Sequence, residues 1–280
     1  MKLLTLNTHS LVEAEYPQKL RAFVETIAEE LPDIIALQEV SQTRDAEVLP
    51  ENLQKGYVPC IPDAFLRADN HVYNAVRMLS ERGVQYSFTW LPIKLGYGKY
   101  DEGIALMSRS PILETDTLTV SRTQDDSNWK TRRIAGIRTA AAPTEWFWSV
   151  HYGWWDDAEE PFAAQWERTI FHLRGKENVW LLGDFNNPAQ VRQEGYDLMA
   201  QSGWHDSYHL AQCKDDGITV GASIDGWHGK FPEGTGLRID RIHCSKRAQV
   251  RSSRVMFNGR GTPVISDHYG VMIEYERNGI

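Results

Sequence analysis

Short apolar runs that end in a polar residue recur along this chain and constrain its fold more than any other feature. Such runs suit buried strands of a few residues. The polar residues that follow them are Asn7, Glu39, His151 and Asp184. One polar residue at a strand end serves a cap or a turn, whereas several Asp, Glu, Asn and His residues at separate strand ends are typical of one convergent site.

The most informative run is Val179 to Leu182, followed by Gly183-Asp184-Phe185-Asn186. Gly183 frees the backbone and ends the strand. Asp184 and Asn186 are two residues apart, so in an extended segment they share a face. A carboxylate beside an amide can hold a metal or orient a water molecule. On this stretch alone, an ordinary turn remains the favoured interpretation.

The order of the remaining elements indicates the fold class. A strand over Lys2–Leu6, a helix from Pro17 to Leu31 and a strand over Ile34–Leu37 open the chain. Further patterns predict many strands and few helices, which favours an α/β (α+β) protein with two packed sheets and helices outside. The other expected helices are Asn70–Arg82, Phe162–Leu173 and Tyr196–Ala200, and the other expected strands are Val84–Leu91, Ile104–Met107, Ile112–Val120, Arg133–Thr139, Trp146–Val150, Leu237–Ile242, Val250–Phe257 and Tyr269–Tyr275. The segment 215–236 is expected to be a functional loop.

Composition limits the class of protein. The chain has 280 residues, 41% hydrophobic and 24% charged, which suits a globular protein of one large domain or two small ones. Its net charge is −8, whereas proteins that bind long polyanions usually carry a basic excess, so nucleic acid is a less favoured partner. Three cysteines without paired spacing favour a reducing compartment, and residues 1–10 are too polar for a secretory signal. No apolar run is long enough to span a membrane, so we expect a cytoplasmic protein without a membrane partner.

Six motifs in order resemble the endonuclease/exonuclease/phosphatase family over nearly the whole chain. They are Leu6-Asn7-Thr8, Leu37-Gln38-Glu39-Val40, Ser149-Val150-His151, Gly183-Asp184-Phe185-Asn186, Ile239-Asp240-Arg241-Ile242 and Ser266-Asp267-His268. The resemblance implies one catalytic domain over residues 1–280, built as a four-layer sandwich of two central, mostly antiparallel β-sheets flanked by helices. It also implies a phosphoesterase that depends on Mg²⁺ or Mn²⁺.

The resemblance assigns a role to each matching position. Glu39 would be the first metal ligand, Asn7 would add an amide oxygen, and Asp267 would lie near the metal. These oxygen ligands suit Mg²⁺. Asp184 would orient or deprotonate the attacking water, with Asn186 beside it.

Further positions would contact the phosphate. His151 would donate to a phosphate oxygen, and His268 would contact the phosphoryl group while Asp240 holds its tautomer. Glu102 resembles the glutamate that supports the His151 position. Arg132 resembles a phosphate-contacting arginine, although strand register leaves Arg133 as the alternative. No role is assigned to His9, His205, His209, His228 or His243.

The loops around these positions favour a sugar phosphate as substrate. The segment after His151 is aromatic and acidic, and Asp225-Gly226-Trp227-His228-Gly229 repeats that character. Aromatic faces beside carboxylates suit sugar rings, and Trp154, Trp155 and Trp227 are the candidate sugar contacts. The opening residues resemble the bacterial branch of the family that includes maltose 6'-phosphate phosphatases.

Two alternatives remain open. A nuclease of the same family would be favoured by a basic groove built from Lys94, Lys99, Arg122, Lys130, Arg132 and Arg133. A non-enzymatic binding module ranks low, because all the expected site residues are present.

Overall fold

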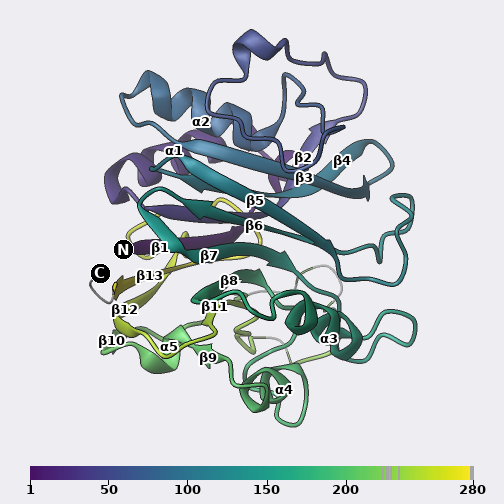
Figure 1. Ribbon diagram of the computed structural model, residues 1–280, viewed down its shortest axis with the longest axis vertical. Coiled ribbons are helices and arrows are strands. Elements are labelled where there is room, and N and C mark those ends of the chain that lie inside the picture. The colour runs from purple at the N-terminus through teal and green to yellow at the C-terminus, as the bar shows by residue number, and fades with distance from the viewer. Residues whose placement is uncertain (222–223, 225–226, 228, 233, 278–280) are drawn as a thin grey trace.

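Two β-sheets packed face to face form the centre of the molecule in a computed structural model that describes residues 1–221, 224, 227, 229–232 and 234–277 (Figure 1). In spatial order, the seven-stranded sheet consists of β10 (Cys213–Lys214), β12 (Gln249–Met256), β13 (Gly270–Glu276), β1 (Lys2–Asn7), β2 (Ile34–Thr43), β4 (Tyr100–Ser108) and β3 (Ser87–Gly96). The six-stranded sheet consists of β5 (Ile112–Thr119), β6 (Arg133–Thr139), β7 (Ala142–His151), β8 (Val179–Asp184), β11 (Asp240–Cys244) and β9 (His205–Asp206). Both sheets are mixed, with most neighbouring strands antiparallel.

Helices cover the two outer faces, so the predicted four-layer sandwich is confirmed. α1 and α2 lie over the seven-stranded sheet, and α3 and α4 lie on the opposite side of the molecule (Figure 1). The helical segments are α1 (Tyr16–Glu30), α2 (His71–Glu81), α3 (Phe162–His172), α4 (Gly195–Gln201), α5 (Ser207–Leu210) and the short 3₁₀ turns η1 (Ser10–Val12) and η2 (Glu51–Leu53). No helix in these described ranges combines the length and the apolar character needed to cross a membrane.

The uninterrupted apolar runs are explained by burial on both faces of the central strands. In β1, Leu3 packs between the sheets while Leu4 packs under α1 and α2. In β8, Leu182 packs between the sheets while Leu181 packs under α3. A strand covered on both sides gains from apolar residues at every position, each stabilising the fold by about 1.5–3 kcal/mol.

β2 extends further than its apolar run indicates. The sequence predicts a strand over Ile34–Leu37, whereas β2 continues to Thr43. A bulge interrupts its pairing with β4 between Leu37 and Val40, and Glu39 within it has a φ of 52°. A bulge redirects side chains while the strand continues, so β2 resumes its pairing with β4 at Val40 after the polar residues Gln38 and Glu39.

β11 starts later than predicted. It begins at Asp240 rather than at Leu237. Leu237 instead forms an isolated β-bridge with Val220. Among the described residues of the segment 215–236, Val220, Ile224 and Trp227 pack with Leu237 in a small apolar cluster of their own. This part of the segment is therefore anchored beside the end of β8 through its packing and through a hydrogen bond from Trp227 to Asn186.

Candidate active site

Asp184 lies in a row of polar residues that crosses the ends of three strands. Parallel pairing aligns His151 of β7 with Asp184 of β8, and antiparallel pairing aligns Asp240 of β11 with the same residue. Side chains opposed on neighbouring strands have Cβ atoms about 5 Å apart, so register alone brings the three together. From the other sheet, Asn7 donates its side-chain amide to Asp184, with Nδ2 3.3 Å from Oδ2. Both sheets therefore contribute to one site.

His268 and Asp240 form a buried ion pair behind Asp184. The His268 Nδ1 atom donates to Asp240, 3.0 Å from Oδ2. Burial alone would lower the pKa of the imidazole, but the adjacent Asp240 carboxylate raises the His268 pKa well above its ordinary value. His268 is therefore a protonated donor, with Nε2 left for a ligand in the cavity that it lines.

Glu39 is presented by the bulge in β2. The hydroxyl groups of Thr8 and Ser10 donate to the Glu39 carbonyl at 3.2 and 2.7 Å, which holds its left-handed backbone in place. Asn7 donates from Nδ2 to the Glu39 carboxylate, 2.9 Å from Oε1. Burial, followed by repulsion from Glu102, raises the Glu39 pKa. A cation near Glu39 would relieve both effects.

Asn186 is fixed on every side of its amide. Its backbone N–H donates to Asp184 Oδ1 at 2.8 Å, and its Nδ2 donates to the Tyr152 carbonyl at 3.0 Å. The indole N–H of Trp227 donates to its Oδ1 at 3.1 Å. The amide is thus locked beside the Asp184 carboxylate.

The electrostatics of the site separate its titratable groups. Burial and then the neighbouring Asp240 raise the pKa of Asp184 to about 7. Burial, followed by the positive charges of Arg132 and Lys94, lowers the His151 pKa well below its ordinary value. The site therefore pairs a carboxyl that titrates near neutrality with a neutral imidazole, an arrangement common at catalytic sites.

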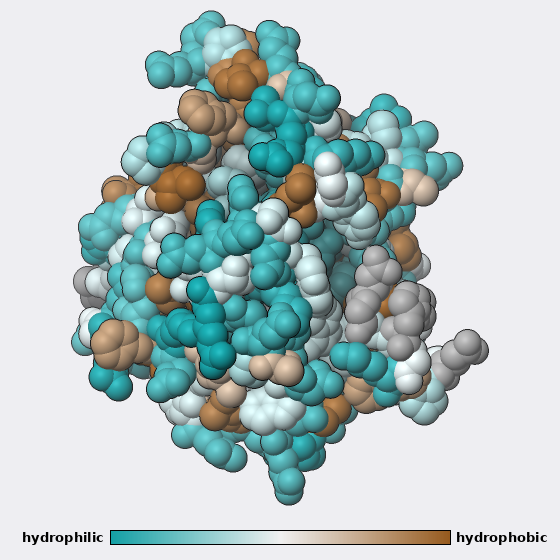
Figure 2. All heavy atoms as spheres, turned by 90° about the vertical axis from the view of Figure 1, so that its right-hand side faces the viewer, coloured by the Kyte–Doolittle hydropathy of each residue, from teal (hydrophilic) through white to brown (hydrophobic). Residues whose placement is uncertain are grey.

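These side chains surround a cavity of about 340 Å³. The face of the molecule at which β7 and β8 end is mostly hydrophilic and is hollowed (Figure 2). Eight residues predicted from the sequence line the cavity: Glu39, Glu102, Arg132, His151, Trp154, Asp184, Asn186 and His268. Asn7 and Asp240 are buried behind them and contact Glu39, Asp184 and His268.

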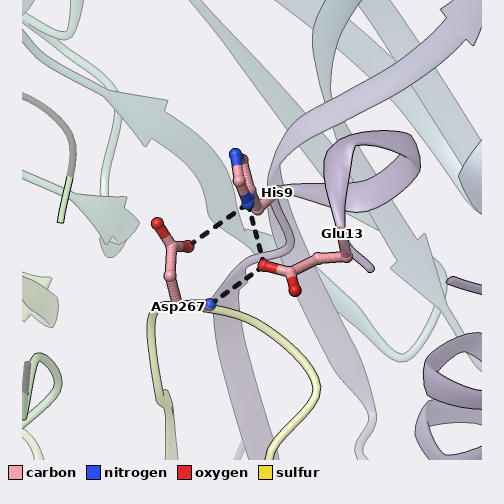
Figure 3. Close-up of side chains that lie close together, drawn as sticks. All are labelled: His9, Glu13 and Asp267. Atoms are coloured by element: carbon pink, nitrogen blue, oxygen red, sulfur yellow. Dashed lines mark hydrogen bonds and ion pairs between the residues drawn. The ribbon is translucent and has the colours of Figure 1, made fainter. Parts of the chain in front are cut away.

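Asp267 belongs to a neighbouring group rather than to the cavity lining. Its carboxylate lies 3.9 Å from Nδ1 of His9, and its backbone N–H donates to Glu13 at 3.2 Å (Figure 3). His9, to which the sequence assigns no role, also contacts Glu13 at 2.8 Å. The Glu13 carboxylate is further paired with Lys19, so this group already holds its own counter-charge.

The structure distinguishes the two candidate arginines. Arg132 lines the cavity, and its Nη1 donates to the carbonyls of Trp129 and Thr131 at 2.9 and 3.1 Å. Arg133 instead donates to the carbonyl of Pro92 at 3.1 Å, away from the site. Arg132 is therefore the one of the two that faces the cavity.

Glu102 has a different neighbour from the one expected. Its carboxylate is 3.1 Å from Nζ of Lys94, directly opposite on β3. Its hydrogen bonds and ion pairs among the described residues do not include His151. Lys94, named from the sequence only as part of a possible nuclease groove, also lines the cavity. Its pairing with Glu102 could not be predicted, because the shift in register between Pro92 and Lys94 cannot be read from the sequence.

Of the three candidate sugar contacts, Trp154 lines the cavity. Trp155 packs against the core under α3, and Trp227 is buried against Asn186. Trp129 also lines the cavity; it is 53% exposed and contacts Trp154 with ring centroids 5.7 Å apart. The signal in the sequence that could have identified Trp129 is its place in a segment rich in Asp and Ser, where a core tryptophan is not expected. Asp225, Gly226 and His228 lie outside the described residues.

The six cations that would build a nuclease groove do not act together. Lys94 and Arg132 line the cavity, but Lys130 is paired with Asp157 and Glu159 at 2.9 and 3.0 Å. Arg133 is bonded to main-chain carbonyls, and Lys99 lies over the ring of Tyr100. Of the six cations, Lys130 is therefore neutralised and Arg133 turned away, while Lys94 and Arg132 are the two that line the cavity.

The sequence profile of the endonuclease/exonuclease/phosphatase family matches residues 4–268. The chain belongs to this family. Its members are metal-dependent hydrolases of phosphate esters. No curated protein sequence matched the chain.

Solved structures of the family share the fold. A family protein from Leptotrichia buccalis is 28% identical with a TM-score of 0.87, and the match covers 99% of this chain and 100% of that one. A mannosyl-6-phosphatase from Bacteroides thetaiotaomicron is 16% identical with a TM-score of 0.65, covering 99% and 100%. A 3'-5' exonuclease from Neisseria meningitidis is 19% identical with a TM-score of 0.63, covering 99% and 100%. The fold thus accommodates both phosphatases and nucleases.

The buried donor set fits a divalent cation. Asp184, Asp240 and His268 each offer a ligand atom within 4.8 Å of the others, and all three are buried. Glu39 adds a third carboxylate, held by Asn7. Burial and then repulsion from neighbouring carboxylates raise the pKa values of Asp184 and Glu39, and a bound cation would favour their charged forms. The carboxylate oxygens of Asp184 and Glu39 are hard donors that match Mg²⁺ or Mn²⁺, whereas a protonated His268 bonded to Asp240 offers no lone pair to a cation.

Proposed function

We propose that the protein is a phosphatase that hydrolyses the phosphomonoester of a small phosphorylated sugar such as maltose 6'-phosphate. The observation that carries this proposal is the composition of one cavity. Buried phosphate-binding groups, Arg132 and His151, stand in the same wall as the aromatic side chains of Trp154 and Trp129. A sugar phosphate needs this combination, because its two ends differ in polarity.

In this proposal the polar end performs the reaction. Asp184 takes a proton from the attacking water, and Asn186, fixed by Trp227, keeps that water in place. His268, protonated by its pairing with Asp240, donates to the phosphoryl group. Arg132 stabilises the charge on the equatorial oxygens, and neutral His151 donates to one of them. Mg²⁺, with Mn²⁺ as a substitute, would be held by Glu39 and Asn7 beside the Asp184 carboxylate, with Asp267 near it, and would supply Lewis-acid stabilisation.

The aromatic end receives the sugar. Trp154 offers a ring face beside Arg132, whose guanidinium lies 5.9 Å from the ring centroid. Trp129 adds an exposed ring at an angle of 60° to it. Trp155 and Trp227 support this region from behind, the first through the core and the second through Asn186. We place the enzyme in the cytoplasm because Cys60, Cys213 and Cys244 are all free thiols.

A direct experiment compares the two kinds of phosphate ester. Purified protein with Mg²⁺ is incubated with a panel of sugar phosphates and, separately, with supercoiled plasmid, and Asp184→Ala serves as the inactive control. Phosphate release from a disaccharide phosphate with intact plasmid supports the proposal. Nicked plasmid with silent sugar phosphates would replace it with nuclease activity.

A further inference from the structure

Lys94 is a buried cation on the cavity wall with no part in the reaction described above. It lies in β3 opposite Glu102 of β4, with Nζ 3.1 Å from Oε1, and its side chain is 13% exposed. The register shifts between Pro92 and Lys94, where the edge strand bulges. Bulges next to active sites commonly redirect a side chain. Lysine is seldom buried without a partner or a ligand.

The ammonium group of Lys94 has more N–H donors than hydrogen-bond acceptors around it. An ammonium group has three N–H donors, and Glu102 accepts from one of them. Among the described residues, Nζ has no second hydrogen-bond partner. Lys94 therefore presents further donors toward the cavity that it lines.

A second buried cation faces the same space from the other sheet. Arg132 precedes β6 and is 3% exposed, so the two cations approach the cavity from opposite layers of the sandwich. Burial lowers the pKa of each, while Glu102 acts in the opposite direction on both. Lys94 and Arg132 thus share one neighbouring carboxylate, and an anion bound in the cavity would stabilise both positive charges.

A terminal phosphate matches two cations better than a bridging phosphate does. A phosphomonoester carries about −1.5 to −2 charges at pH 7 and three terminal oxygens. A phosphodiester carries a single charge and two free oxygens. The third oxygen and the second charge are therefore what a second cation can recognise.

We infer that Lys94, acting with Arg132, selects a terminal phosphate dianion over a phosphodiester. This inference rests on the proposed phosphatase function and names the residue that keeps the site from acting as a nuclease. Glu102 holds Lys94 in place before the substrate arrives.

The test compares p-nitrophenyl phosphate with bis(p-nitrophenyl) phosphate in the presence of Mn²⁺. In Lys94→Met, kcat/KM for the monoester should fall by about 30-fold or more, as expected for loss of a charge-assisted hydrogen bond, and far less for the diester. Inhibition by inorganic phosphate should weaken in parallel. Equal losses on both esters would overturn the inference.

Matched variants show whether a lost preference for the monoester comes from the missing Lys94 donor or from a disturbed fold. Lys94→Met leaves the Glu102 charge uncompensated, so Lys94→Met/Glu102→Gln is measured beside it and should show the same loss of monoester preference. Lys176→Met removes another carboxylate-paired lysine, 2.9 Å from Asp116, outside the cavity, and should keep the parent preference. A parent enzyme that prefers the diester would overturn the inference as well. Activity on p-nitrophenyl phosphate but on no sugar phosphate would refute the sugar substrate alone and leave the role of Lys94 supported.

Discussion

The indole N–H of Trp227 donates a hydrogen bond to the side-chain oxygen of Asn186 at 3.1 Å. That contact joins the segment 215–236 to the end of β8, beside which Val220, Ile224 and Trp227 also pack. Asn186 has a φ of 48°, which a non-glycine residue rarely adopts without support. A residue expected from the sequence to touch a sugar therefore lies where it orients the amide next to Asp184.

We predict that Trp227→Phe lowers kcat by about 10-fold with a small change in KM, because the ring is kept while the hydrogen bond to Asn186 is lost. Steady-state phosphatase kinetics measure this. Trp180→Phe is the matched control, since its indole N–H donates to Glu145 at 2.9 Å, outside the cavity lining. Full activity in Trp227→Phe would show that Asn186 needs no such support.

Asp240→Asn should move the alkaline limb of the pH profile of kcat/KM to lower pH. Asp240 raises the His268 pKa, so the imidazolium persists into alkaline solution in the parent. Without that charge, His268 loses its proton at lower pH, and activity at pH 8 should fall by about 100-fold, a loss typical of general acid–base groups. Superimposable profiles for the two proteins would exclude His268 as the protonated donor.

Asp184→Asn should stabilise the metal-free protein at pH 8. The folded pKa of Asp184 is about 7, above the ordinary value of 3.8. A carboxyl whose pKa is raised by folding favours the folded state at low pH, and that contribution is lost as pH rises from about 4 to about 7. At about 1.4 kcal/mol per pKa unit, removing the charge should recover roughly 2–4 kcal/mol. Urea unfolding at pH 5 and pH 8 measures it.

Thermal unfolding of the parent and of Asp184→Asn at the same two pH values tests metal binding. Added Mn²⁺ should raise the melting temperature of the parent more at pH 8 than at pH 5, because the ligands must be deprotonated. Asp184→Asn should lose most of this shift. A stabilisation by Mn²⁺ that is equal in both proteins would place the cation elsewhere.

Gly183→Ala should destabilise the protein by more than about 3 kcal/mol, as expected for a buried steric clash. A Cβ atom at Gly183 would lie 1.9 Å from the Val150 carbonyl oxygen, and φ there is 156°. Gly203→Ala is the control, because a Cβ there meets no atom within 4 Å and only its φ of 84° opposes it. It should cost about 1 kcal/mol. Chemical denaturation compares both variants with the parent.

The places where β7 and β8 reach the site could be predicted from the sequence because apolar runs are local signals. Val179 to Leu182 is buried on both faces, so its hydrophobic residues stop where the strand reaches the site at Asp184. His151 follows the same rule in β7. The order of the motifs then identified the family, and with it the four layers.

Other features depend on contacts between distant segments and leave no local trace. The bulge at Glu39 is set by the pairing of β2 with β4, and the direction of Lys94 by the pairing of β3 with β4. The contact between Trp227 and Asn186 joins residues 41 positions apart. The place of Asp267 near the metal stays a prediction, and its contacts with His9 and Glu13 are set by how the loop before β13 meets η1 (Figure 3).

The most direct test of a sugar phosphatase is a comparison of kcat/KM for maltose 6'-phosphate with that for a DNA hairpin carrying a 3'-phosphate, under the same Mg²⁺ concentration. Both substrates are phosphomonoesters, so the comparison isolates what lies beyond the phosphate. A cavity walled by Trp129 and Trp154, on a protein of net charge −8, should favour the sugar by about 100-fold or more. An equal or higher kcat/KM for the DNA hairpin would contradict the account and identify a nucleic-acid phosphatase.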